Sequence, residues 1–317
     1  MILIVGDSSD IHISSVCNLL TDPEQVIFIN PHNAVECIKF TFSPFLVSFF
    51  KENKEYSANE IGAIWWRIKP KLSSNSFDLK EAETAQFILR EWLFMLEPLS
   101  NFLADKFWIN QRSIDKEVRN KPNQLITASK LGFSIPKTCI TNNPVELFLF
   151  FKEEEYIIYK PLGYLIIPPD EVLYANKIKV TELKKRSAHI SVAPGIFQEY
   201  IQKAYELRIT IVDHEIFAVK IDSQAEANTT IDWRKDQNGA SYELIDLDDS
   251  FKHRLLALHQ AFGLVFGAYD FIVTPNNEYV FLEVNPAGQW LWMEDKLENL
   301  KITQSLANVL SAHQIKQ

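Results

Sequence analysis

Cysteine and glycine are both scarce in this chain of 317 residues. The three cysteines, Cys17, Cys37 and Cys139, are odd in number and show no CxxC spacing, so the sequence indicates neither a disulfide framework nor a zinc knuckle. They are expected to be ordinary small core residues. With only 9 glycines in the chain, each one is expected to mark a turn or a close approach of the backbone.

Two common nucleotide-binding motifs are also absent from the sequence. No GxxxxGK[ST] occurs anywhere, and no GxGxxG follows the apolar opening MILIV. A bound nucleotide would therefore have to be held by lysines at its phosphates and by carboxylates through a metal. The seven histidines are scattered, and no Ser/His/Asp or Cys/His order predicts a nucleophilic triad.

The charge balance is acidic, with a net charge of -9 and a pI near 5.4. This balance argues against general binding to nucleic acid, which requires a basic surface. No apolar run approaches the length of a membrane span, and MILIVG lacks the basic region and the cleavage site of a signal peptide. The sequence therefore predicts a cytoplasmic protein with no nucleic acid and no membrane as partner.

The hydrophobic content of 47% and the length favour a globular protein with a large core and two or three subdomains. In residues 1–114 the strands MILIV, QVIFIN and GAIWWRI alternate with the helix HISSVCNLL. A long helical pattern follows over residues 78–103. These elements predict an α/β amino-terminal domain.

A second unit is predicted for residues 115–196. Pro122 is expected to open a helix and Gly132 to close it, and the strand IPKTCIT, a helix from Asn143 and the strand EYIIYKP follow. In residues 197–317 the pattern predicts several strands, a helix, a hairpin and a terminal helix.

The predicted hairpin lies in YDFIVTPNNEYVFLEVNPAGQWLW, where two apolar runs flank the turn residues PNNE. It carries Asp270, Glu283 and Asn285 where a core would hold apolar residues. If Thr274 lies opposite Tyr279, then Asp270 lies opposite Glu283, and Asn285 shares their face. Two carboxylates and an amide suit Mg²⁺ and do not suit zinc, although the trio alone is equally consistent with a buried polar network.

Charged residues elsewhere supply partners for this trio. Lys121 stands just ahead of a helix, Lys160 ends the strand YIIYK, and FQEYIQKAYELRITIV places Glu199, Glu206 and Arg208 around a strand break. A single lysine is most simply a solvated surface residue, but two lysines from different subdomains could neutralise phosphates. Together with the oxygen trio they favour a site for a nucleotide and its metal ion.

The tryptophans are expected to belong mostly to the core. This applies to Trp65, Trp66, Trp290 and Trp292, and also to the phenylalanines of PFLVSFF. An apolar surface left over from the core would be the physical basis of a groove for a peptide.

The order of these residues resembles the ATP-grasp superfamily from about residue 115 to the end of the chain. The matching positions are Lys121, Lys160-Pro161, FQEYI, Glu206-Leu207-Arg208, Asp270 and Glu283-Val284-Asn285-Pro286. More narrowly, VKIDSQ, the DWR of residues 232–234 and EVNPAGQWLW resemble the ATP-grasp peptide maturases of the microviridin type, the graspetide synthetases. The resemblance implies an ATP-grasp fold preceded by an α/β pre-ATP-grasp domain, which the stretch IWWRIKP also resembles.

The resemblance also implies a role for each site residue, with ATP and Mg²⁺ as cofactors. Lys121 and Lys160 would contact the phosphates, Glu199, Tyr200 and Ile201 would form the adenine hinge, Glu206 would hold the ribose, and Asp270, Glu283 and Asn285 would bind Mg²⁺. Arg208 and Arg234 would lie near the γ-phosphate and the substrate carboxylate, where a planar bidentate donor fits. The loop PLGYLIIPPD departs from the family, since it has a single glycine where many members have several.

The implied reaction begins when ATP converts an Asp or Glu side chain of a ribosomal precursor peptide to an acyl phosphate. A Thr or Ser hydroxyl would then give an ω-ester, or a Lys amine an ω-amide, and the enzyme would be a homodimer that grips a leader segment of the precursor. Two alternatives stay open from the sequence. One is a small-molecule or carboxyl-terminal carboxylate-amine ligase like glutathione synthetase or the ribosomal-protein glutamate ligases. The other is a non-catalytic nucleotide-binding scaffold, against which the intact metal trio argues.

Overall fold

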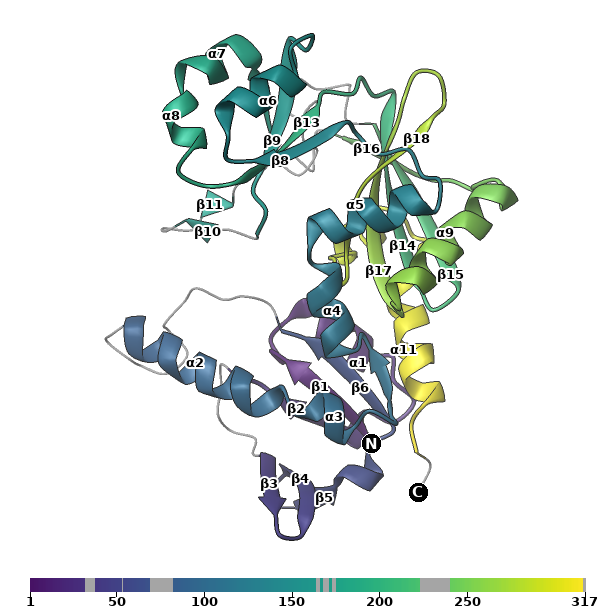
Figure 1. Cartoon of the computed structure of the whole chain (residues 1–317). Coiled ribbons are helices and arrows are strands. Elements are labelled where there is room, and N and C mark those ends of the chain that lie inside the picture. The colour runs from purple at the N-terminus through teal and green to yellow at the C-terminus, as the bar shows by residue number, and fades with distance from the viewer. Residues whose placement is uncertain are drawn as a thin grey trace.

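The computed structural model describes residues 1–31, 38–52, 54–68, 82–163, 166–167, 171–172, 175–222 and 240–315. Figure 1 shows the carboxyl-terminal antiparallel sheet between a parallel sheet near the amino terminus and a second antiparallel sheet from the middle of the chain, the central sheet. The predicted α/β class is confirmed. None of the helices in the described part of the chain combines the length and the apolar character needed to cross a lipid bilayer.

The amino-terminal sheet has the strand order β2-β1-β6-β7, and its strands are parallel. The strands are β1 (Ile2–Gly6), β2 (Val26–Ile29), β6 (Ala63–Arg67) and β7 (Phe107–Ile109), with helix α1 (Ile11–Cys17) and the 3-10 helix η1 (Pro23–Gln25) after β1. Every residue of β1 and β6 is buried, as expected for parallel strands covered on both faces. The three strands and the helix predicted for this region are therefore confirmed.

Two features of this region differ from the sequence-based expectation. A three-stranded antiparallel sheet of β3 (Ile38–Phe42), β4 (Phe45–Lys51) and β5 (Lys54–Ser57), followed by the 3-10 helix η2 (Ala58–Glu60), was not predicted. The prediction of a single long helix is wrong, because these residues form two helices, α2 (Ala82–Leu96) and α3 (Leu99–Phe102). Pro98 lies between them, and it lacks the backbone N–H that would continue the hydrogen-bond ladder of the first helix. Residues 78–81 lie outside the described residues.

The middle of the chain follows the predicted order. Its elements are α4 (Arg112–Val118), α5 (Lys121–Lys130), β8 (Thr138–Thr141), α6 (Pro144–Phe150), β9 (Tyr156–Lys160), β10 (Ile166–Ile167), β11 (Glu171–Val172), β12 (Asn176–Lys179), α7 (Val180–Lys185), α8 (Ser187–Ile190) and β13 (Gly195–Glu199). Pro122 lies in the first turn of α5, and Gly132 just beyond it adopts a φ of 76°. Asn143 caps α6 by accepting from the backbone of Val145 and Glu146.

The carboxyl-terminal sheet has the order β16-β15-β14-β17-β18. Its elements are β14 (Tyr205–Val212), β15 (Glu215–Asp222), β16 (Ser241–Leu244), α9 (Asp249–Phe262), β17 (Phe266–Val273), β18 (Tyr279–Asn285), α10 (Leu291–Glu294) and α11 (Ile302–Ala312). One apolar face packs against residues of α5 and α9. The other joins a core that also contains residues of β1, α1, β6 and α11, so the amino-terminal and carboxyl-terminal sheets share one core.

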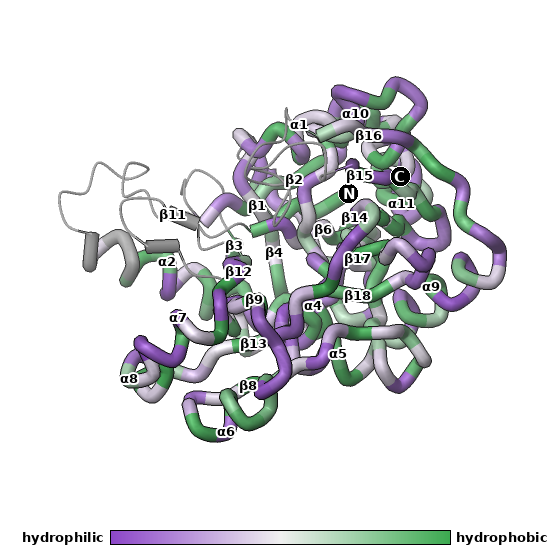
Figure 2. Tube along the Cα trace, turned by 90° about the horizontal axis from the view of Figure 1, so that it is seen from above, coloured by the Kyte–Doolittle hydropathy of each residue, from purple (hydrophilic) through white to green (hydrophobic). Residues whose placement is uncertain are grey.

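Hydrophobic residues concentrate along the strands of these two sheets when the molecule is viewed from above (Figure 2). Trp65, Trp66 and Trp290 are buried, as predicted, whereas Phe45 of the β3–β4 hairpin is 63% exposed and is not a core residue. Cys17 and Cys139 are half-buried and pack beside core clusters. Burial raises the pKa of the Cys17 thiol to about 11, which is consistent with an unreactive packing role.

Candidate active site

A pocket with an empty volume of about 680 Å³ lies between the central sheet and the carboxyl-terminal sheet. It brings together many of the residues predicted from the sequence: Lys160, Glu199, Tyr200, Ile201, Glu206, Asp270 and Glu283. Ile158, Ile272 and Leu282 add apolar wall. Its mixture of apolar walls with a few charged groups suits a small-molecule ligand such as a nucleotide.

One end of the pocket is formed by the segment that links the two sheets. Glu199 ends β13, and its Oε1 accepts a hydrogen bond of 2.7 Å from the backbone N–H of Lys137. The next residue, Tyr200, has the centre of its ring 3.4 Å from the Nζ of Lys177 on strand β12 of the same sheet. The carboxylate of Glu199 therefore supports the linker itself, while Tyr200 and Ile201 line the pocket.

A buried ion pair in the same segment was not singled out from the sequence. The Nζ of Lys203 lies 2.5 Å from Oε1 of Glu206, and the two residues are only 6% and 7% exposed. The pair holds the carboxylate of Glu206 at the pocket wall, because a buried carboxylate is stable only with a partner. A lysine three residues before a glutamate, at the start of an otherwise apolar strand, was the available signal.

The hairpin of β17 and β18 places Asp270 directly opposite Glu283, as predicted. The predicted pairing of Thr274 with Tyr279 is wrong, because Tyr279 pairs with Val273. A register shift next to Asp270 adds one residue to β18 and compensates for the error. The two carboxylates consequently meet although the turn is one residue longer than expected.

Positive side chains accompany both carboxylates. Nη1 of Arg208 lies 2.9 Å from Oδ1 of Asp270, and Nζ of Lys121 lies 3.5 Å from Oε2 of Glu283. The same Nζ is 3.5 Å from the carbonyl oxygen of Pro161, which directly follows Lys160. Lys121 thus reaches from α5 to the end of β9 and to the hairpin, and the cost of the acidic pair is offset by cations on two other elements.

Asn285 completes the predicted trio at the end of β18. It pairs with Ala268, lies two residues beyond Glu283 and so shares its face of the strand. Its Oδ1 accepts from the backbone N–H of Ala287 at 3.0 Å. The described residues contain no cluster of three His, Cys, Asp or Glu side chains that could hold a metal, but an all-oxygen set of two carboxylates and an amide fits Mg²⁺.

The chain is similar to several solved structures over nearly its whole length. The RiPP-associated ATP-grasp ligase of Chryseobacterium gregarium, in complex with ADP and a leader and core peptide, is 28% identical with a TM-score of 0.83, and the match covers 98% of this chain and 96% of that chain. The macrocyclase MdnC of Microcystis aeruginosa MRC, bound with the precursor peptide MdnA, is 25% identical with a TM-score of 0.83, and the match covers 98% and 100%. Over nearly its whole length, the chain is similar in fold to this ATP-grasp ligase and to this macrocyclase.

A more distant ATP-grasp neighbour shows the fold alone. It is the ligase PsnB complexed with a phosphomimetic variant of its minimal precursor, Mg and ADP, at 21% identity and a TM-score of 0.75, with 99% of this chain and 98% of that chain covered. No family model and no curated protein matches the sequence. The predicted ATP-grasp fold is confirmed, and the predicted cofactors, ATP and Mg²⁺, agree with the ligands of these neighbours.

A second buried polar side chain beside the predicted site that was not singled out from the sequence is Gln124 of α5. Its Oε1 accepts from the N–H of Val284 at 2.9 Å, and its Nε2 donates to the carbonyl oxygen of Val284 at 2.8 Å. Nε2 also donates to the carbonyl oxygen of Val118. Because Val284 stands between Glu283 and Asn285, the buried amide fixes the strand that carries both predicted metal ligands.

Arg234 and the rest of DWR lie outside the described residues, as do parts of the loop PLGYLIIPPD and the end of VKIDSQ. The predicted role of Arg234 and the effect of the single glycine in that loop stay predictions. The other predicted arginine, Arg208, is 7% exposed and faces the hairpin through Asp270.

Proposed function

We propose that this chain is an ATP-dependent ligase that crosslinks a ribosomally made precursor peptide. It activates Asp or Glu side-chain carboxylates as acyl phosphates and joins them to Thr or Ser hydroxyls as ω-esters, or to Lys amines as ω-amides. The proposal is carried by the likeness over 98% of the chain to a ligase in complex with ADP, leader and core peptide. The pocket supports it, since its lysine, glutamates and aspartate suit a nucleotide with its metal.

In this proposal the pocket residues hold Mg²⁺-ATP in the order that the fold presents them. Lys121 and Lys160 contact the phosphates, Glu199, Tyr200 and Ile201 contact the adenine, Glu206 holds the ribose, and Asp270, Glu283 and Asn285 hold the metal ion. The side chain of Glu199 already accepts from the backbone of Lys137, so the adenine contacts of the linker come mainly from its backbone and its apolar walls. When bound, Mg²⁺ offsets the negative charge of the phosphate oxygens.

The chemistry proceeds by two transfers at the same carboxyl group, first of a phosphoryl group to one of its oxygens and then of its acyl carbon to the nucleophile. A carboxylate oxygen attacks the γ-phosphorus, and ADP leaves. The hydroxyl or amine then attacks the carbonyl carbon, phosphate leaves, and the nucleophile loses its proton. Arg208 and Arg234 hold the carboxylate in line and stabilise charge on the acyl phosphate, for which a guanidinium fork is suited.

The proposed partners are a precursor with leader and core segments and a second copy of the chain. A C₂ dimer is the commonest oligomer of soluble proteins. The β3–β4 hairpin and α2 expose apolar side chains that a partner could cover: Phe42, Phe45, Leu46, Phe87 and Phe94. A monomeric mass in light scattering at micromolar concentration would contradict the dimer.

The decisive experiment is co-expression with the short reading frame nearest to the gene, followed by mass spectrometry of the peptide. Each crosslink removes one water, and hydroxylamine cleaves an ester crosslink while leaving an amide intact. A control variant that should keep the crosslinking activity is Glu243→Gln on β16. The Glu243 carboxylate is exposed and pairs with Lys220, away from the pocket. ADP release with a small amine but no change in any peptide would favour the small-molecule ligase, and nucleotide binding without any ADP release would favour the scaffold.

A further inference from the structure

The segment 286–290, which follows the last predicted metal ligand, is held by an unusual series of side-chain donors. Asn110 Nδ2 donates to the carbonyl oxygen of Pro286 at 3.0 Å, Arg67 Nη1 lies 3.4 Å from those of Ala287 and of Gly288, and Arg208 Nη2 lies 3.4 Å from that of Gln289. Four consecutive backbone carbonyls therefore accept hydrogen bonds from side chains instead of from backbone N–H groups of a helix or a sheet. Two of the three donors, Asn110 and Arg67, lie at the end of the amino-terminal sheet.

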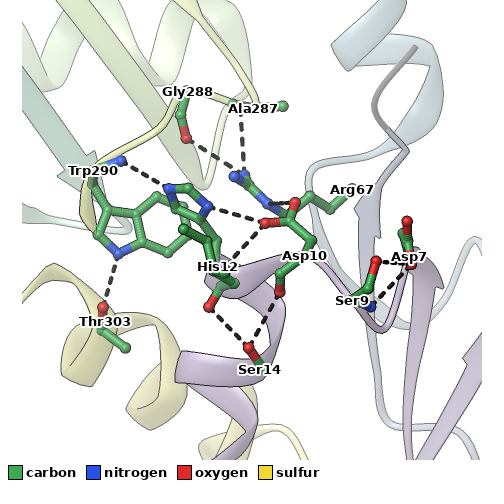
Figure 3. Close-up of polar contacts among 11 residues, drawn as sticks. Asp7, Ser9, Asp10, His12, Ser14, Arg67, Ala287, Gly288, Trp290 and Thr303 are labelled. Carbon is green, nitrogen blue, oxygen red and sulfur yellow. Dashed lines mark hydrogen bonds and ion pairs between the residues drawn. The ribbon is translucent and has the colours of Figure 1, made fainter. Parts of the chain in front are cut away.

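Arg67 is buried where β6 ends, with only 2% of its surface exposed. Its Nε donates to Oδ2 of Asp10 at 3.2 Å, and its guanidinium lies 4.8 Å from the centre of the Trp290 ring (Figure 3). Burial lowers the pKa of Arg67 to about 10, and Asp10 opposes that shift, so the side chain is charged at neutral pH. A buried charge of this kind costs more stability than an apolar residue would, which points to a role beyond packing.

Asp10 also fixes the far end of the segment through His12. The backbone N–H of Trp290 lies 3.3 Å from Nε2 of His12, and Nδ1 of His12 lies 3.0 Å from Oδ1 of Asp10 (Figure 3). Since the N–H of Trp290 can only donate, Nε2 accepts and the ring proton sits on Nδ1. One carboxylate thereby orients two side chains that hold the same segment.

On its other side the segment packs against Arg208. A Cβ built on Gly288 would lie 2.7 Å from Nη2 of Arg208 and 2.4 Å from Cβ of Ala268. Any side chain at this position would displace the guanidinium or the strand, so Gly288 is one of the glycines that mark a close approach. Gly288 consequently stands between the two guanidinium groups, with Arg67 at its carbonyl and Arg208 at its Cα.

We propose that Arg67 is a positioning residue for the metal site, acting through the segment 286–290 on Arg208 and Asn285. The amino-terminal domain would in this way be part of the machinery that binds Mg²⁺-nucleotide. Arg67 uses two nitrogens at once, one for Asp10 and one for the two carbonyls, and a lysine has a single nitrogen that cannot serve both. The inference rests on the proposed function in so far as Asp270, Glu283 and Asn285 bind the metal.

The test is the Mg²⁺ dependence of ADP binding to the full chain, measured by calorimetry in wild type and in Arg67→Lys. In Arg67→Lys, the Mg²⁺ concentration that gives half of the maximal increase in ADP affinity should rise by about ten- to a hundredfold. This is the range found when residues that support metal ligands are changed. ADP affinity in EDTA should stay unchanged, because the variant does not touch the linker at residues 199–201.

A double variant separates positioning from general destabilisation. Arg208→Lys alone should raise the Mg²⁺ requirement, and Arg67→Lys with Arg208→Lys should raise it little further, because the two residues act in series. The matched control is Arg112→Lys, whose guanidinium also lies over a tryptophan, 5.0 Å from the Trp66 ring, and pairs with Glu97 and Asp115 rather than with the segment. It should leave the Mg²⁺ requirement unchanged.

If Arg67→Lys fails to fold, Gly288→Ala carries the same test from the other side of the segment. Gly288→Ala should raise the Mg²⁺ requirement for ADP binding by the same factor as Arg67→Lys. Combined with Arg208→Lys, it should raise that requirement little further. An unchanged Mg²⁺ requirement, or losses that add fully, would overturn the positioning role while leaving the proposed function in place. A wild-type chain that binds no ADP at any Mg²⁺ concentration would overturn both.

Discussion

At the scale of single residues, the predicted trio of Asp270, Glu283 and Asn285 is stable because each carboxylate pairs with a cation and a buried amide binds the strand between Glu283 and Asn285. Arg208 pairs with Asp270, Lys121 with Glu283, and Gln124 satisfies both backbone groups of Val284. Removing one partner from such a set leaves a buried polar group without compensation.

Glu283→Gln should abolish peptide crosslinking and leave the fold intact. The substitution removes a charged metal ligand, whereas the apolar pairs of the hairpin remain. Turnover at saturating Mg²⁺ and circular dichroism check the two parts. Ordinary turnover in this variant would remove Glu283 from the metal site.

Gln124→Met should lower the free energy of unfolding by about 1–3 kcal/mol, because both backbone groups of Val284 lose their partner in a buried site. It should also raise the Mg²⁺ requirement for ADP binding. Urea unfolding and calorimetry measure the two effects. The comparison is Gln304→Met on α11, whose amide bonds only to Asn308 on an exposed face.

Arg234→Lys should keep near-normal ATP affinity and lose peptide modification by about ten- to a hundredfold, the scale of one misplaced transition-state donor. The prediction rests on the resemblance of DWR to the family, since Arg234 lies outside the described residues. Nucleotide titration and precursor turnover test it together. Unchanged turnover would mean that Arg234 pairs with a neighbouring carboxylate on the loop, and a parallel loss of ATP binding would assign it to the nucleotide.

At the scale of elements, helix α9 is anchored to β17 by a buried histidine. Nδ1 of His259 lies 2.9 Å from the hydroxyl of Tyr269, and burial lowers the pKa of His259 from 6.5 to about 4. The folded protein therefore contains the neutral imidazole, because the effect of burial outweighs the opposing effects of the Val265 backbone and of Asp213.

The free energy of unfolding should fall as the pH drops from about 6.5 to about 4. Between these pH values His259 binds a proton in the unfolded chain but not in the folded chain. Lowering the pH therefore reduces the free energy of unfolding, by up to about 3 kcal/mol. Urea unfolding at a series of pH values measures the slope. His259→Gln should flatten it, whereas His214→Gln, at an exposed turn, should not.

At the scale of the whole molecule, one core joins the amino-terminal sheet to the carboxyl-terminal sheet. It contains Trp65 of β6, Val219 of β15, Trp290 and Leu306 of α11. A shared core makes the two parts stabilise each other, so the amino-terminal domain is not an independent attachment.

The two parts should therefore unfold in a single transition. Fluorescence of the seven tryptophans, which include Trp65 and Trp290 of the shared core, and loss of ADP binding should have the same urea midpoint. Leu306→Ala, fully buried in that core, should lower both midpoints together, at a cost of about 2–5 kcal/mol. Two separate midpoints would show that the shared core does not couple the parts.

The amino-acid sequence alone determined many of the strands and helices, although not the sheet of β3, β4 and β5, and it determined which hairpin residues share a face. The period of the apolar residues, Pro122, Gly132 and the turn residues of PNNE are local signals, and the elements they predicted are present. The order of Lys121, Lys160 and the hairpin acids was also sufficient to predict the fold. The local pattern did not predict the break in the long helix at Pro98, because a proline within a helical pattern of apolar residues can either kink the helix or end it.

Only the tertiary structure decided which distant groups meet. The bulge beside Asp270, the clamp of Gln124 on Val284 and the contacts of Arg67 with the segment 286–290 join residues up to 221 positions apart. A glutamine or an arginine looks the same in a sequence whether it faces solvent or a backbone carbonyl. Its partner is set by how whole sheets pack, because that packing determines which polar backbone groups are buried and must be paired.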